Sequence, residues 1–254
     1  MTFAVSGEMY DRFMGRYSRR LAPTFADFAG IGPTARVVDV GCGAGALTGE
    51  LAARLGPASV AAADPSEPLF EACRARIPDA DVRLAPAEAL PWADASFDAA
   101  LSQLVVNFMA DADAGVAEMR RVVVEDGVVG ACTWEYEGMR MLRTFWKAAA
   151  SVDPDAPDES RVMRFQGAEA LDALWHETGL REVETAPLDV AVEYEDFDDF
   201  WLPFEGGIGP AGEYLASVGP EAQVQIRDEC FRCLGEPAGP FTQTARAWAV
   251  RGER

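Results

Sequence analysis

Short apolar runs alternate with segments of helical periodicity through the first half of the chain. The runs are of strand length and are closed by glycine, proline or acidic residues, which is typical of buried strands that end in turns. Strands that alternate with helices of this length indicate a parallel sheet covered by helices, an α/β fold. The predicted strands cover residues 35–40, 58–63, 81–85, 97–103 and 127–134, and the predicted helices cover 46–55, 66–76, 87–89 and 111–124.

The pattern changes at the two ends of the chain. Aromatic and apolar residues at helical spacing over residues 8–29 predict one or two helices packed on the core. Beyond residue 136 the apolar positions are less regular, and glycines interrupt the helical stretches. We expect helices at 139–150 and 167–178, a long strand at 181–193, an irregular helical region at 196–235 and a last strand at 242–250.

Residues 37–48 give the strongest indication of a ligand-binding site in the sequence. An apolar strand ends at Asp39, and glycines follow at positions 41, 43 and 45 before a helix begins. Glycine can adopt positive φ and leaves the backbone open to a ligand, and a helix start offers unpaired N–H groups to negative charge. A nucleotide-like ligand is therefore expected at the carboxyl end of this strand.

A second acid, Asp64, ends the second predicted strand about twenty residues beyond the glycines. A carboxylate at this place can accept hydrogen bonds from both hydroxyls of a ribose. Asp64 can also cap the helix that opens at Pro65 and Ser66, and the two roles can coexist. The glycine pattern alone also fits the loose dinucleotide fingerprint, so it does not by itself identify the nucleotide.

Charge and cysteine content narrow the class of partner. The formal net charge is −20, and a strongly acidic surface repels nucleic acid and anionic lipid, so neither is an expected partner. The arginines at positions 12, 16, 19 and 20 are too few to hold a duplex. The N-terminus lacks a signal-peptide pattern, no apolar run reaches membrane-spanning length, and the five cysteines are scattered, so a reduced, cytoplasmic protein is expected.

Four segments in order resemble the class I S-adenosylmethionine-dependent methyltransferases, in the small-molecule branch related to ubiquinone and menaquinone biosynthesis. They are the glycine turn after Asp39, the acid Asp64, Ala-Glu-Ala-Leu-Pro-Trp at 87–92 and Ser-Phe-Asp at 96–98. The resemblance implies one Rossmann-like domain over residues 1–254, with a seven-stranded, mostly parallel sheet whose last strand is antiparallel, plus a helical cap. Within it, residues 1–30 would form cap helices, 31–136 the cofactor-binding core, 137–240 the half with acceptor-side insertions and 241–254 the last strand.

The same resemblance implies S-adenosylmethionine as cofactor, with S-adenosylhomocysteine as product. Asp39 would order the glycine turn and interact with the cofactor ammonium, and Asp64 would hold the ribose hydroxyls. The N-terminal helix would fold over the cofactor, although an ordinary buried stripe explains its aromatic residues equally well. The implied cofactor contacts are Asp39, Gly41, Cys42, Gly43, Gly45, Asp64, Pro65, Ser66, Ala87, Glu88, Gln103, Leu104, Tyr10, Met14 and Arg16.

Adenine recognition departs from the family pattern. Many relatives carry Gly-Asp before the Ala-Glu pair, and the aspartate takes the adenine amino group. This chain has Ala85 and Pro86 at those positions. Recognition would then depend on Glu88, on backbone groups or on water.

The sequence names no catalytic base and no metal site. An activated methyl donor mainly needs an aligned acceptor, although a weakly acidic acceptor also needs a base. His176, the only histidine, falls on an outer helix and is expected to be inert, whereas Glu135 and Tyr136 end a strand near the expected site. A lone Cys-x-x-Cys at Cys230 lacks the two further ligands that a metal ion needs.

The expected reaction is transfer of a methyl group to a small, apolar or aromatic molecule by in-line displacement. Aromatic residues of the second half suggest such a pocket, with Trp134, Trp201 and Phe204 as candidate acceptor contacts and core packing as the competing interpretation. One alternative is a cofactor-binding module without turnover. Another is a nicotinamide-dependent oxidoreductase, although no tyrosine stands four positions before Lys147, the only lysine. The pattern does not indicate the oligomeric state.

Overall fold

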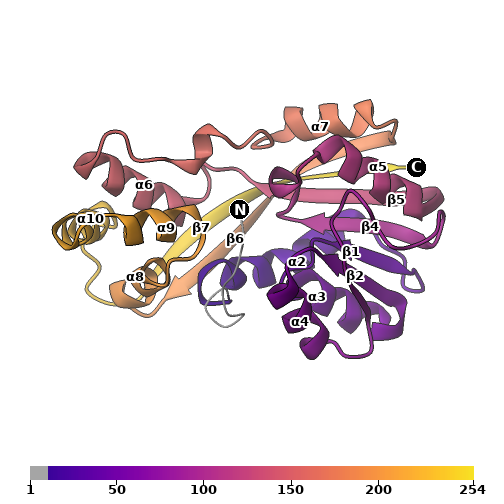
Figure 1. The fold of residues 1–254 in the computed structure, drawn as a ribbon, viewed down its shortest axis with the longest axis horizontal. Coiled ribbons are helices and arrows are strands. Elements are labelled where there is room, and N and C mark those ends of the chain that lie inside the picture. The colour runs from indigo at the N-terminus through magenta and orange to yellow at the C-terminus, as the bar shows by residue number, and fades with distance from the viewer. Residues whose placement is uncertain (1–10) are drawn as a thin grey trace.

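A seven-stranded β-sheet forms the centre of residues 11–254, the part of the chain that the structure, a computed structural model, describes (Figure 1). The strand order is β3-β2-β1-β4-β5-β7-β6. Strands β1 to β5 pair in parallel, and β7 runs antiparallel to both of its neighbours, β5 and β6. The predicted mostly parallel sheet with an antiparallel last strand is therefore confirmed. The strands are β1 (Val37–Val40), β2 (Val60–Asp64), β3 (Asp81–Leu84), β4 (Phe97–Gln103), β5 (Val123–Trp134), β6 (Arg181–Tyr194) and β7 (Phe241–Glu253).

Helices cover both faces of the sheet, which explains why the central strands read as continuous apolar runs. Successive residues of β1 lie in different cores. Val37 belongs to the core that contains Leu47, and Val38 belongs to the core that contains Val116. Helices α2 (Arg16–Ala29) and α3 (Ala46–Leu55) supply the first core, and α5 (Ala112–Val122) and α7 (Ala168–Glu177) supply the second. Helix α4 (Glu67–Arg76) packs on β2 and β3.

Four further helices gather beyond the parallel part of the sheet, beside one end of β6 and β7 (Figure 1). Their packing is dominated by buried aromatic rings, such as Phe145 stacked on Phe204 with ring centroids 4.7 Å apart. They are α6 (Arg140–Val152), α8 (Phe197–Glu205), α9 (Gly209–Ser217) and α10 (Pro220–Cys233). None of the helices within residues 11–254 is long and apolar enough to cross a membrane.

Two sequence predictions differ from the observed elements. Residues 87–89 form a turn rather than a short helix, because the segment lies between Pro86 and Pro91 and closes with a single Ala89 N–H bond to the Pro86 carbonyl. The irregular region 196–235 resolves into three helices. Proline stands in the first turn of α9 and of α10, where its missing N–H costs no hydrogen bond.

The remaining short elements connect these layers. The first described segment, Asp11–Gly15, is a π-helix that leads into α2. Single 3₁₀ turns lie at Pro57–Ser59, Val106–Phe108 and Glu159–Arg161. Two of them, Val106–Phe108 and Glu159–Arg161, contribute side chains to the candidate site.

Candidate active site

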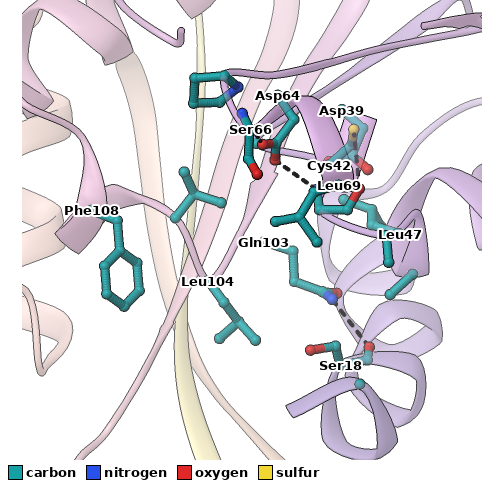
Figure 2. A pocket seen from close by; sticks show the side chains of 17 residues that line it. Ser18, Asp39, Cys42, Leu47, Asp64, Ser66, Leu69, Gln103, Leu104 and Phe108 are labelled. Carbon is teal, nitrogen blue, oxygen red and sulfur yellow. Dashed lines mark hydrogen bonds between the residues drawn. The ribbon is translucent and has the colours of Figure 1, made fainter. Parts of the chain in front are cut away.

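A cavity of about 300 Å³, the first cavity, lies at the carboxyl ends of β1, β2 and β4, where the strand order reverses (Figure 2). Such a reversal is where open α/β sheets bind their ligands. Among residues 11–254 it is lined by Gly15, Ser18, Asp39, Gly41, Cys42, Gly43, Ala44, Ala46, Leu47, Asp64, Pro65, Ser66, Leu69, Gln103, Leu104, Val105 and Phe108.

The glycine turn is fixed against β2 and presents bare backbone to this cavity. Gly41 and Cys42 both donate backbone N–H bonds to the Ala63 carbonyl, at 2.8 and 3.0 Å. Gly41 has φ +77°, and a Cβ there would lie 2.4 Å from the Val105 side chain. A Cβ at Gly43 would meet no described atom within 4 Å, so this position faces open space. Gly45 lies outside the cavity lining.

Asp39 carries a buried carboxylate oxygen without a partner. Its Oδ2 accepts a 2.6 Å hydrogen bond from Thr48 Oγ1, whereas its Oδ1 has no hydrogen-bond partner among residues 11–254. Burial raises the pKa of Asp39 to about 7, and the nearby Asp64 adds to the rise. Gln103 presents a second such acceptor, because its Nε2 donates to the Ser18 carbonyl while its buried Oε1 is unpaired within the described chain. Two unpaired acceptors beside one cavity suit a ligand with several N–H donors, such as an ammonium group.

Asp64 faces the same cavity from the end of β2. Its two oxygens accept backbone N–H bonds from Gly43, at 2.8 Å, and from Ser66, at 2.9 Å. Burial raises the pKa of Asp64, while these two bonds lower it. Each carboxylate oxygen has a second lone pair, so the same group can still accept two ligand hydroxyls. Turn ordering and ligand binding are therefore compatible at Asp64.

The residues of the N-terminal segment that were predicted to contact the cofactor do not line the first cavity in the described part of the chain. Tyr10 lies outside the described residues. Arg16 donates two hydrogen bonds to Asp199, at 3.1 and 2.8 Å, and its guanidinium lies over the Tyr194 ring, so it is engaged away from the first cavity. Gly15 and Ser18, which the sequence analysis did not select, line the cavity instead. The helical spacing predicted which apolar residues of this segment are buried. It did not indicate that these two small residues would line a cavity.

The predicted adenine contacts, Ala87 and Glu88, are not among the described residues that line the first cavity. Ala87 is buried in the core, and Glu88 Oε1 accepts a 3.1 Å hydrogen bond from the Asp111 backbone. Their role toward adenine stays a prediction. Pro65 and Ser66, also expected near adenine, do line the cavity.

A second, smaller cavity of about 70 Å³ adjoins the first and shares Leu104 and Phe108 with it. Leu104 has φ +67°, an uncommon conformation for a residue with a side chain, and its N–H donates to the Cys132 carbonyl at 2.8 Å. Among the described residues the second cavity is lined by Phe13, Met14, Leu104, Phe108, Trp134, Tyr136, Leu142, Glu159, Ile208, Gly209, Pro210 and Ala211.

Of the three predicted acceptor contacts, Trp134 lines the second cavity, whereas Trp201 and Phe204 line neither of the two cavities described above. Trp201 donates its indole N–H to Glu205 at 2.7 Å, and Phe204 is stacked in the aromatic core, so both belong to the packing of the helical part. Tyr136 lies in the second cavity, near the site as expected, together with Glu159, which the sequence analysis missed.

Other candidates lie away from both cavities. His176 is exposed on α7 and contacts the Asp172 carbonyl of its own helix. Cys230 is buried and Cys233 half-buried on α10. Within residues 11–254 no group of three or more histidine, cysteine, aspartate or glutamate side chains is arranged to hold a metal ion.

The chain is similar to known methyltransferases. Residues 38–130 match the family model of the methyltransferase domain. An uncharacterised protein of Mycobacterium tuberculosis is 33% identical over 214 residues, which are 80% of this chain and 74% of that protein. The malonyl-[acyl-carrier protein] O-methyltransferase of Geobacter sulfurreducens is 31% identical over 179 residues, 69% of this chain and 65% of that enzyme. A solved structure from Anaeromyxobacter dehalogenans, provisionally described as a type II methyltransferase, superposes with a TM-score of 0.65 at 23% identity, over 91% of this chain and 95% of its own.

Proposed function

Because the chain belongs to the class I S-adenosylmethionine-dependent methyltransferases, we propose that this enzyme methylates a small, apolar or aromatic molecule bound in the second cavity. Its cofactor is S-adenosylmethionine. Family membership sets aside the nicotinamide-dependent oxidoreductase, which the glycine pattern alone had left open.

The first cavity fits the cofactor by the chemistry of its donor set. The unpaired oxygens of Asp39 and Gln103 would receive the ammonium group, and the Asp64 carboxylate would receive the ribose hydroxyls. Bare backbone at Gly43 leaves room for close approach. The cofactor supplies a methyl group already activated on a sulfonium, so the protein mainly binds, orients and excludes water.

The shared wall between the two cavities is the observation that carries the acceptor proposal. Leu104 and Phe108 contact both spaces, so a molecule in the second cavity would lie next to a cofactor in the first. Most residues around the second cavity are apolar, including Phe13, Leu142 and Ile208. An apolar lining with a few polar groups is typical of a small-molecule site.

Asp64→Ala tests the cofactor site. Loss of hydrogen bonds to a charged group should weaken S-adenosylhomocysteine binding by about 1–3 kcal/mol, measured by isothermal titration calorimetry. The exposed variant Asp79→Asn is the control and should bind like the wild type. An unchanged dissociation constant for Asp64→Ala would remove this residue from the site.

Transfer of a labelled methyl group to a panel of small molecules tests turnover. Neutral aromatic acceptors should be methylated in preference to charged ones of the same size. Narrowing the second cavity with Ala211→Leu should reduce transfer while leaving S-adenosylhomocysteine binding intact, because Ala211 lines only the second cavity. Equal transfer by this variant and the wild type would contradict the proposed acceptor site.

A further inference from the structure

Glu159 is a carboxylate buried in an otherwise mostly apolar cavity. Only 5% of the residue is exposed, and its Oε2 has no hydrogen-bond partner among residues 11–254. It stands in the 3₁₀ turn Glu159–Arg161, which Asp158 caps by accepting the Ser160 N–H. An unpaired buried carboxylate oxygen is costly, so its retention in a ligand cavity points to a partner supplied by the ligand.

Trp134 brings an unpaired donor to the same cavity. Its indole Nε1 is buried and has no acceptor within the described chain. Glu159 and Trp134 therefore both line the second cavity, and each carries one polar atom, Oε2 and Nε1, that has no hydrogen-bond partner within residues 11–254. A ligand group that both donates and accepts would complement the pair.

We infer that Glu159 is the general base of the reaction and takes the proton of a hydroxyl group on the methyl acceptor, most simply a phenol. This assignment rests on the proposed function, because it names the acceptor group at the same site. A hydroxyl oxygen has two lone pairs, so it can accept from Trp134 and still attack the methyl carbon. A neutral amine has one lone pair, which the attack would use, and would leave the indole N–H unpaired.

The protonation behaviour of Glu159 suits this role. Burial raises the pKa of Glu159 to about 7, hydrogen bonding by the nearby Trp146 indole lowers it, and the charge of Asp158 adds to the rise. Asp158 is itself paired with Arg143 at 2.6 Å, and Tyr136 is the other titratable neighbour. A base with a pKa near the operating pH is the most effective one, and a phenol, with a pKa of about 10, lies within its reach.

The step balances without a further reactant. The acceptor O–H bond breaks and its proton passes to Glu159, while the oxygen forms the new O–CH₃ bond. The S–CH₃ bond breaks and its electron pair stays on sulfur, which becomes a neutral thioether. The products are a methyl ether, S-adenosylhomocysteine and a protonated Glu159, which then releases its proton to solvent.

The size of the second cavity sets how such an acceptor would lie. A cavity of about 150 Å³ holds benzene, so a space of about 70 Å³ holds only part of an aromatic ring. The rest of the ring would extend between Leu104 and Phe108 toward the first cavity. The hydroxyl end would then lie among Glu159, Trp134 and Tyr136.

Binding of phenol and of its methyl ether, anisole, tests the hydrogen bond without turnover. At pH 8, with S-adenosylhomocysteine present, the wild type should bind phenol about tenfold or more tighter than anisole, measured by tryptophan fluorescence. Glu159→Leu should bind the two equally, because leucine has no acceptor. The exposed Glu169→Gln is the matched control and should keep the preference. Equal binding by the wild type, no binding of either probe, or a preference that persists in Glu159→Leu would each overturn the inference.

Turnover of the same probe separates a base from a binding group. Glu159→Gln keeps an acceptor oxygen but cannot take a proton, so phenol affinity should change less than about threefold while the rate of methyl transfer falls 10²- to 10⁴-fold. With S-adenosylmethionine saturating at every pH, so that the titration of Asp39 does not enter, kcat/KM for phenol in the wild type should rise with pH and level off above about 7. This rise should vanish in the variant. A rate or a pH profile unchanged in Glu159→Gln would overturn the assignment. Methyl transfer only to acceptors without a hydroxyl would also overturn it while leaving the proposed function intact, and failure to bind S-adenosylhomocysteine would contradict the proposed function itself.

Discussion

Among single residues, the sequence motifs marked several that line the first cavity. Asp39, Gly43 and Asp64 all line the first cavity, because motif spacing follows the carboxyl ends of β1 and β2, which lie side by side in a parallel sheet. Glu159 was missed for the opposite reason. It belongs to an irregular loop, and only the tertiary fold brings that loop to Leu104 and Trp134. Neither periodicity nor a motif marks such a residue.

Asp39 gives a prediction about pH. Its pKa of about 7 lies above that of an unfolded aspartate, so its contribution to stability is fully present below about pH 4 and is lost as the pH rises through 7. Binding of an ammonium group requires the ionised form. Affinity for S-adenosylhomocysteine should therefore fall as the pH is lowered from 7.5 to 5.5, approaching tenfold per pH unit, in calorimetric titrations.

The variant Asp39→Asn separates the effect of Asp39 on ligand binding from its effect on stability. The amide still accepts from Thr48 but carries no charge, so binding should weaken and lose most of its pH dependence, while the free energy of unfolding at pH 8 stays equal to or above that of the wild type. A variant that lost affinity and stability together would show that Asp39 acts through the fold alone.

At the scale of elements, the alternation of apolar runs and helical segments predicted all five parallel strands. It predicted residues 87–89 as a short helix, whereas the structure has a turn between two prolines there. It also could not divide 196–235 into α8, α9 and α10. Their apolar residues pack against other helices as well as the ends of β6 and β7, so no single surface imposes a regular period. The pattern of apolar residues therefore predicts the bounds of a helix or strand best where that element packs on one face of the β-sheet.

The glycine turn contains two positions, 41 and 43, where glycine is required for different reasons. Gly41→Ala places a methyl group 2.4 Å from Val105 at φ +77°, and it should cost about 2–4 kcal/mol of unfolding free energy in urea titrations. Gly43→Ala meets open space at φ +53°, so it should cost only about 1–2 kcal/mol, the penalty of the left-handed conformation. Its methyl group should instead obstruct the ligand and weaken S-adenosylhomocysteine binding.

The two alanine variants control for each other, since both carry the same substitution in the same turn. Val105→Ala should restore part of the stability lost in Gly41→Ala, because it removes the atoms that clash. Equal losses of stability at both positions, with no rescue, would mean that backbone strain rather than close packing selects glycine at position 41.

At the scale of the whole molecule, the net charge of −20 favours cations over anions near the surface. The first cavity adds to this field, because Asp39 and Asp64 both face it. S-adenosylmethionine carries one more positive charge than S-adenosylhomocysteine, on its sulfonium. The molecule should therefore attract the methyl donor more strongly than the spent product, which would assist exchange of the two.

Salt separates this long-range attraction from contacts inside the cavity. The screening length shrinks from about 30 Å at 0.01 M to about 3 Å at 1 M ionic strength, so added salt weakens long-range attraction and leaves short, buried contacts nearly unchanged. Between 0.02 and 0.5 M sodium chloride the dissociation constant of S-adenosylmethionine should rise several-fold, and that of S-adenosylhomocysteine should change less. Calorimetric titration of both ligands at each salt concentration measures the difference. Parallel salt dependences would mean that the sulfonium gains nothing from the acidic surface and that selection between donor and product depends on the cavity alone.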